Sequence, residues 1–207
     1  MKIVYGTSNQ SKLSFMRKRL EGLDVEIIGL DSMDMALSEP DETGKNPTDN
    51  AYIKARGYYQ QLKMPVMSAD SGLFFEGAAE EDQPGVLIKR IHGKDLNGKE
   101  MVHYYSNLAE KYGGKLLARY KNALCLVVGE DTHYMLEESA LESEPFYIVA
   151  KPHHHYEEGF PLNSLSVDIS TMQYYYDLDT VKDKYERTDF DHNIRTFIEG
   201  LLLMEEK

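Results

Sequence analysis

The chain has 207 residues, 42% hydrophobic and 28% charged, which is typical of a folded globular protein rather than a disordered one. Its formal net charge of −12 argues against a surface for duplex nucleic acid, because such surfaces carry a positive footprint. The sequence lacks an apolar run of the roughly 18 residues that a membrane span needs, and no signal peptide follows Met1. The single cysteine, Cys125, lies in an apolar run and is expected to be buried, so we expect a cytoplasmic protein that binds neither nucleic acid nor membranes.

The N-terminal third predicts strands that alternate with helices. Apolar runs and helical spacing of apolar residues predict strands over Lys2–Gly6, Val25–Leu30 and Pro65–Ala69, and helices over Gln10–Leu20 and from Thr48, as N-cap, to Lys63. The third strand is expected to stop at Asp70.

The rest of the chain predicts a helix, then antiparallel strands, then further helices. The expected ranges are a helix over Asn97–Tyr112, strands over Leu116–Val128, His133–Glu142 and Phe146–Lys151, and helical segments over Asp179–Glu186 and Asp189–Met204. This order predicts an α/β fold in which helices pack on a mixed central sheet, with residues 1–207 forming a single domain.

Small polar residues follow the first strand, at the start of the first predicted helix. The segment Thr7–Lys12 places backbone N–H groups where a helix favours an anion, and Lys12 can add a full positive charge. This pattern suits a phosphate group. The alternative is an ordinary helix cap with a surface lysine.

Acidic residues stand in two other loops, Glu39–Gly44 before the second helix and Asp70–Ser71 after the third strand. Carboxylates from separate loops, without cysteine or histidine, suit a hard cation such as Mg²⁺. Two other interpretations stay open: a solvated acidic surface, and a simple turn at Asp70. The run His153–His155 is expected to be an exposed loop rather than a metal site.

Four motifs in the first half, at matching spacing, resemble the inosine triphosphate pyrophosphatase family. The family's TGNxxK phosphate loop is similar to Thr7–Lys12, with Ser8 in place of the glycine. Its PEPEETGxTFEENAxxKA is similar to residues 39–55, its ADDSGL to Ser68–Leu73 with Ala69 replacing the first aspartate, and its PGVYSARYAG to Pro84–Gly93.

The second half departs from the family. The segment Gly159–Ser164 stands where the family carries GFGYDP, and it keeps Phe160 but has Asn163 in place of the aspartate. The family's KNxxSHR, which helps to read the base, falls on Lys184–Phe190, where Lys184 matches and Ser-His-Arg is absent.

The resemblance implies a Mg²⁺-dependent enzyme that hydrolyses deaminated purine nucleoside triphosphates, such as ITP, dITP and XTP, to the monophosphate and pyrophosphate. It implies two lobes that flank a nucleotide-binding cleft, and a homodimer. Asp70 would be the general base and, with Glu42, a metal ligand, and Lys12 would be catalytic. The substrate-binding residues would be Thr7, Ser8, Asn9, Lys12, Asn50, Lys54, Ser71, Arg90, Phe160, Asn163 and Lys184.

Two alternatives to this activity follow from the departures. One is a nucleotide-binding protein with weakened catalysis, and the other is a pyrophosphatase of the same fold with altered base specificity.

Overall fold

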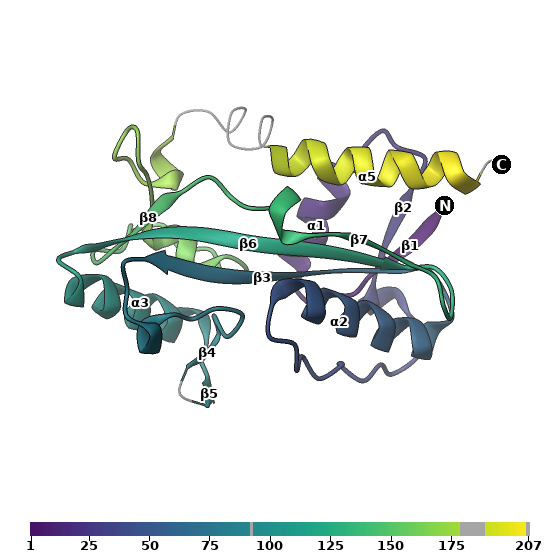
Figure 1. The fold of residues 1–207 in the computed structure, drawn as a ribbon, viewed down its shortest axis with the longest axis horizontal. Helices are drawn as coiled ribbons and strands as arrows, with labels where there is room; N and C mark the ends of the chain where they lie inside the picture. The colour runs from purple at the N-terminus through teal and green to yellow at the C-terminus, as the bar shows by residue number, and fades with distance from the viewer. Residues whose placement is uncertain (92, 179–188, 206–207) are drawn as a thin grey trace. The chain divides into compact units, whose positions relative to one another are not determined.

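The computed structural model describes residues 1–91, 93–178 and 189–205 (Figure 1). The strands are β1 (Lys2–Tyr5), β2 (Glu26–Gly29), β3 (Val66–Glu76), β4 (Arg90–Ile91), β5 (Lys94–Asp95), β6 (Lys115–Val127), β7 (His133–Leu136), β8 (Phe146–Val149) and β9 (Ser166–Asp168). The α-helices are α1 (Gln10–Arg19), α2 (Pro47–Leu62), α3 (Gly98–Lys111) and α5 (Asp189–Glu205), and the short 3-10 helices are η1 (Leu30–Ser32), η2 (Glu80–Asp82), η3 (Glu138–Ala140), η4 (Pro161–Leu165) and η5 (Tyr175–Asp177).

The chain divides into two compact units. Unit 1 comprises Met1–Ser71, Asn122–Glu142 and Arg187–Lys207, and unit 2 comprises Gly72–Lys121 and Ser143–Glu186. The long strands β3 and β6 contribute residues to both units. That the whole chain acts as one domain stays a prediction.

Parallel and antiparallel strands occur together, as predicted. In unit 1, β1 pairs in parallel with both β2 and β3, and β7 pairs antiparallel with β6. In unit 2, β8 pairs antiparallel with β6 and β9. The prediction of an α/β fold with helices on a mixed sheet is confirmed.

In unit 1, helices cover both faces of the sheet (Figure 1). Helices α1 and α5 bury their apolar residues on one face, together with Met67 of β3, and α2 covers the other face with residues such as Ala55. Cys125 is buried on the α2 face, as predicted, and burial raises the pKa of its thiol to about 12. Side chains on β3 therefore alternate between the α1–α5 face and the α2 face.

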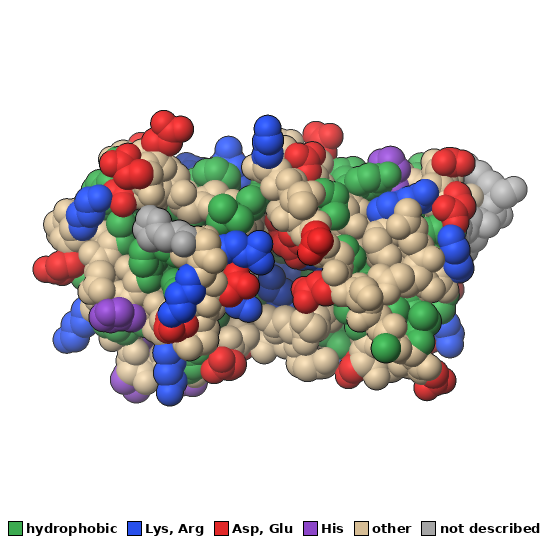
Figure 2. All heavy atoms as spheres, turned by 90° about the horizontal axis from the view of Figure 1, so that it is seen from below, with side chains coloured by type: hydrophobic (Ala, Val, Ile, Leu, Met, Phe, Trp, Pro, Cys, Tyr) green, Lys and Arg blue, Asp and Glu red, His purple; other side chains and the backbone are tan. Residues whose placement is uncertain are grey.

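In unit 2, α3 packs its apolar side against β8 and η4, around the buried Tyr105 and Phe146. This helix begins with a capping box, in which Asn97 and Glu100 each accept a backbone N–H of the other. Among the described residues of both units, no helix is long and apolar enough to cross a membrane. On the face drawn in Figure 2, acidic and basic side chains are interspersed, so the net negative charge does not form one acidic surface there.

The predicted end of the third strand at Asp70 is wrong. Strand β3 is eleven residues long and runs from Val66 through Asp70 to Glu76. Leu73 and Phe75, which follow the polar residues, are buried. Their packing stabilises an extended chain at residues whose types favour a turn. Asp70 is therefore held within a strand rather than on a flexible turn.

Two element boundaries also differ from their predictions. Helix α2 begins at Pro47, and its N-cap is Asn46 rather than Thr48, because the Asn46 side chain accepts the N–H of Asp49 at 2.8 Å. Strand β7 ends at Leu136, earlier than expected, and η3 follows it. The predicted C-terminal helix is confirmed as α5, whereas the helical segment predicted over Asp179–Glu186 lies outside the described residues.

Candidate active site

The segment Thr7–Lys12, which we call the phosphate-loop segment, leads from β1 into α1 in unit 1, as the sequence predicts. Asn9 is the N-cap of α1, and its Oδ1 accepts the N–H groups of Ser11 at 2.9 Å and Lys12 at 3.2 Å. The Thr7 hydroxyl accepts the N–H of Asn9 at 3.2 Å, which shapes the turn. Hydrogen bonds among the described residues leave the N–H groups of Ser8 and Gln10 without an acceptor, so they remain available to an anion at the helix N-terminus.

Close packing at Gly6 places this segment against β3 and α2. A Cβ atom at Gly6 would lie 2.2 Å from Ser68 Oγ and 2.9 Å from the ring of Tyr58, so a larger residue would force neighbours apart. The N–H of Gly6 donates to the carbonyl of Met67 at 2.8 Å. The phosphate-loop segment therefore starts beside the strand that carries Asp70.

Asn50, on α2, fixes one oxygen of Asp70. Its Oδ1 accepts the N–H of Gly44 at 2.8 Å, and its Nδ2 donates to Asp70 Oδ2 at 3.2 Å. Because the Gly44 N–H can only face an acceptor, the amide of Asn50 has one orientation, with its NH₂ group toward Asp70. Only 2% of Asn50 is exposed, so this short link between the acidic loop and β3 lies inside unit 1.

Lys54 lies one helical turn after Asn50, on the same face of α2. Its ammonium group is 2.5 Å from Glu42 Oε1 and 3.7 Å from Asp70 Oδ1. Glu42 and Asp70 thus point at the same position from two different segments of unit 1. We call Lys12, Glu42, Asn50, Lys54 and Asp70 the Asp70 cluster.

The surroundings of Asp70 raise its pKa above the ordinary value for an aspartate. Burial is the main cause, and the negative charge of Glu42 acts in the same direction. Lys54, the hydrogen bond from Asn50 and the charge of Lys12 oppose the shift. A carboxylate with a raised pKa is a better proton acceptor, which is what a general base requires.

The donor atoms of the Asp70 cluster fit Mg²⁺. Glu42 and Asp70 offer carboxylate oxygens to one position, and the described residues contain no group of three or more His, Cys, Asp or Glu side chains that could hold a metal by themselves. Magnesium is usually held by one or two carboxylates and completes its shell with water and substrate phosphates. The cluster therefore matches a cation that is shared with a phosphate ligand.

Lys12 differs from Lys54 because it forms no ion pair among the described residues and is exposed. We expect Lys12→Ala to raise the KM for a nucleoside triphosphate by about tenfold, because the predicted contact with phosphate would lose its positive charge. Steady-state kinetics measure this. Lys18→Ala, the same change near the other end of α1, is the control, and an unchanged KM and kcat for Lys12→Ala would make Lys12 an ordinary surface residue.

The side chain of Ser71 does not lie in the Asp70 cluster. Its hydroxyl donates to Asn122 Oδ1 at 2.7 Å, and Asn122 donates in turn to the carbonyl of Leu141 at 2.8 Å. Neighbouring residues of a strand point to opposite faces, so Ser71 and Asp70 lie on opposite faces of β3. The substrate contact of Ser71 stays a prediction.

The other predicted substrate residues belong to unit 2 or to the part of the chain that is not described. Arg90 donates to Asp95 Oδ1 at 2.9 Å across the β4–β5 pair. Phe160 is the N-cap residue of η4, and its carbonyl accepts the N–H of Asn163 at 3.0 Å. Lys184 lies outside the described residues. The substrate roles of these four residues stay predictions.

The histidine run is partly different from its prediction. His154 and His155 are exposed, but the side chain of His153 is only 8% exposed and its Nε2 lies 3.1 Å from Asp177 Oδ1. Nδ1 of His153 accepts the N–H of His155 at 3.0 Å. Both ring nitrogens of His153 are thus engaged in holding the loop.

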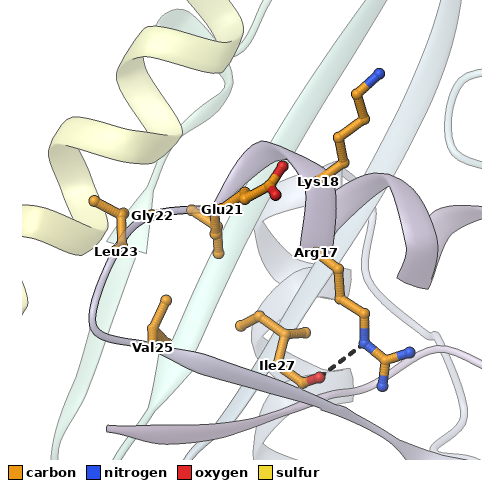
Figure 3. Close-up of a pocket in the computed structure, with 8 residues that line it drawn as sticks. Arg17, Lys18, Glu21, Gly22, Leu23, Val25 and Ile27 are labelled. Carbon is orange, nitrogen blue, oxygen red and sulfur yellow. Dashed lines mark hydrogen bonds between the residues drawn. The ribbon is translucent and has the colours of Figure 1, made fainter.

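A separate hollow of about 450 Å³ lies in unit 1 between the end of α1 and β2 (Figure 3). Arg17, on its wall, donates from Nε to the carbonyl of Ile27 at 2.9 Å, and Leu23 and Val25 supply apolar surface. None of its lining residues belongs to the Asp70 cluster, so this hollow is distinct from the candidate active site.

The fold and the site define an α/β protein in which a polar strand-to-helix segment and two converging carboxylates lie in the same unit. Residues 3–161 match the model of the Ham1 family, and the chain belongs to this family. That model covers the phosphate-loop segment and every member of the Asp70 cluster.

Curated relatives and solved structures agree with this assignment. The chain is 34% identical over 122 residues to a dITP/XTP pyrophosphatase of Aquifex aeolicus, a match that covers 59% of this chain and 56% of the relative. It is 30% identical over 146 residues to a dITP/XTP pyrophosphatase of Elusimicrobium minutum, covering 66% and 71%. The structure of a HAM1 protein from Coxiella burnetii superposes with a TM-score of 0.70 at 21% identity over 100% of both chains, which shows the same fold. The chain spans about half the length of the first curated relatives that it matches.

Proposed function

We propose that this protein is a Mg²⁺-dependent nucleoside triphosphate pyrophosphohydrolase, which converts the triphosphate to the monophosphate and pyrophosphate. The proposal rests on the convergence of Glu42 and Asp70 on one position, close to Lys12 in the first turn of α1. The names of the relatives, dITP/XTP pyrophosphatases, support deaminated purine nucleotides as the substrates.

The residues of the Asp70 cluster have different roles in the proposed reaction. Asp70 accepts a proton from a water molecule while the water oxygen attacks the α-phosphorus, and the bond to the β-phosphate oxygen breaks to release pyrophosphate. Asn50 keeps the Asp70 carboxylate in place by its hydrogen bond. Lys12 and the N–H groups of Ser8 and Gln10 bind phosphate oxygens. Mg²⁺, held by Glu42 and Asp70, would neutralise charge on the phosphates.

The proposal extends to the setting of the enzyme. We propose a cytoplasmic homodimer that acts on free nucleotides, cleansing the nucleotide pool. The high net negative charge supports a small ligand rather than nucleic acid, since duplex-binding surfaces need many positive charges.

Pyrophosphate release from a panel of ITP, XTP, GTP, ATP and a pyrimidine triphosphate tests the proposal, with Mg²⁺ and with excess EDTA. We expect hydrolysis that depends on Mg²⁺ and a preference for ITP over ATP below about a thousandfold, because Asn163 and the replaced Ser-His-Arg motif leave fewer polar groups to read the base.

Three outcomes of the panel are informative. Nucleotide binding without pyrophosphate release would contradict the enzyme and favour the nucleotide-binding alternative. A preferred substrate other than a deaminated purine would show altered base specificity. A preference for ITP over ATP of about a thousandfold or more would contradict the specificity prediction, because shape alone does not supply it.

A further inference from the structure

The ammonium group of Lys54 lies where the two carboxylates of the Asp70 cluster converge. It contacts Glu42 at 2.5 Å and approaches Asp70 at 3.7 Å. Its side chain is 14% exposed, so water screens this charge only in part. Lys54 therefore already neutralises the oxygens that would hold a divalent cation.

The charges of the Asp70 cluster balance. By formal charge, Lys12 and Lys54 are positive and Glu42 and Asp70 are negative, so the four ionisable groups sum to zero. A divalent cation that enters alone would give the cluster a net charge of +2 and would meet a fixed ammonium group at close range. Close like charges in partly buried surroundings repel strongly.

A triphosphate changes this balance. It brings several negative charges and offers phosphate oxygens as new acceptors for an ammonium group. Lys54 is then drawn away from the carboxylates to a phosphate oxygen, and the oxygens of Glu42 and Asp70 would become available to hold a cation. A methionine at this position has neither charge nor hydrogen-bond donor and could do neither.

We propose that the ammonium group of Lys54 takes the role of the divalent cation in the metal-free protein, a role that we call the stand-in role. It holds Glu42 and Asp70 together, and it leaves them only when a nucleotide binds. This inference rests on the proposed function, since the nucleotide is the ligand that draws Lys54 away. Its consequence is that Mg²⁺ and nucleotide bind cooperatively, and each raises the affinity for the other by the same factor.

Calorimetric titration of the protein with Mg²⁺ alone tests the first half of the proposal and requires no turnover. We expect Lys54→Met to bind Mg²⁺ at least about tenfold more tightly than the unmodified protein, because the competing charge is gone. Lys12→Met is the matched control: it removes the same charge near the same carboxylates but breaks no ion pair, so its effect should be smaller. Equal, weaker or undetectable Mg²⁺ binding by Lys54→Met overturns the proposal.

A second titration tests the cooperativity, using Mg²⁺ in the presence of the α,β-methylene analogue of ITP. In the unmodified protein the analogue should tighten Mg²⁺ binding, and in Lys54→Met this gain should shrink. Equal gains in both proteins would mean that contact of the cation with phosphate explains all of the coupling, which overturns the role of Lys54.

Folding of the variants is checked by circular dichroism, and Lys54→Gln replaces Lys54→Met if the latter does not fold. The proposed function can fail independently of this inference. Absence of pyrophosphate release together with tighter Mg²⁺ binding by Lys54→Met would refute the enzyme and leave the stand-in role of Lys54 supported.

Discussion

Asp70→Asn should lower the rate of pyrophosphate release by about 10³-fold or more, because it removes the proposed base and one of two carboxylates at the metal position. The substitution keeps the volume of the side chain and an oxygen that can accept the Asn50 amide. Kinetics under saturating Mg²⁺ measure the loss.

The stability of the same variant should not fall. Burial raises the pKa of Asp70, so its ionised form is disfavoured in the folded protein, and the metal-free protein should gain stability as the pH falls through that raised pKa. Asp70→Asn should lack this gain and, near neutral pH in EDTA, should melt at the same temperature as the unmodified protein or higher. Nearly normal turnover by a folded Asp70→Asn protein would refute the assignment of Asp70, whereas Asp41→Asn, an exposed acid of the neighbouring loop, should behave like the unmodified protein.

Asn50→Asp should disturb both stability and catalysis. The new carboxylate can still accept the Gly44 N–H, but it replaces the donor to Asp70 by a second buried negative charge. We expect a loss of about 1–3 kcal/mol in the free energy of unfolding at neutral pH in EDTA. The repulsion should raise the pKa of the pair further, so stability should recover as the pH is lowered through it.

The pH profile distinguishes this electrostatic effect from simple misfolding. The acid limb of kcat/KM should move to higher pH in Asn50→Asp, because Asp70 must lose its proton to act as a base. Asn46→Asp is the matched control: Asn46 only accepts a hydrogen bond at the helix N-cap, where aspartate serves as well. An unchanged melting temperature and pH profile for Asn50→Asp would show that Asn50 does not position Asp70.

The order of strands and helices was predictable from the sequence where local patterns decide it. Helices α1 and α5 follow directly from the helical spacing of their apolar residues, which are buried in unit 1. The continuation of β3 through Asp70 was not predictable in this way, because Asp, Ser and Gly favour turns locally. Packing of Leu73 and Phe75 in unit 2, a tertiary effect, overrides that preference.

The candidate site was predictable mainly by family resemblance. Residue chemistry alone indicated an anion at Thr7–Lys12 and a hard cation at the acidic loops, but not which carboxylates converge. The link from Gly44 through Asn50 to Asp70 depends on contacts between three separate segments. The spacing of Asn50 and Lys54, four residues apart on one helix, was the available signal that both would reach the same place.

Ala69, which replaces the first aspartate of the family's ADDSGL motif, points away from the candidate site. Ala69 packs against the apolar residues on the α1–α5 face of unit 1, whereas Asp70 and Lys54 meet on the α2 face. An acid at position 69 would point away from the Asp70 cluster in this structure. The absence of that acid is therefore compatible with an intact arrangement of Glu42 and Asp70.

The composition of unit 1 from three separate stretches of chain has a consequence for biosynthesis. The phosphate loop, Lys54 and Asp70 all belong to the first stretch, and they leave the ribosome early. Helix α5, which covers the apolar surface formed by β1, α1 and β3, is translated after the other described elements. A nascent chain therefore carries the chemical groups of the site well before its fold can hold them, and until α5 docks this surface is open to chaperones and to other unfinished chains.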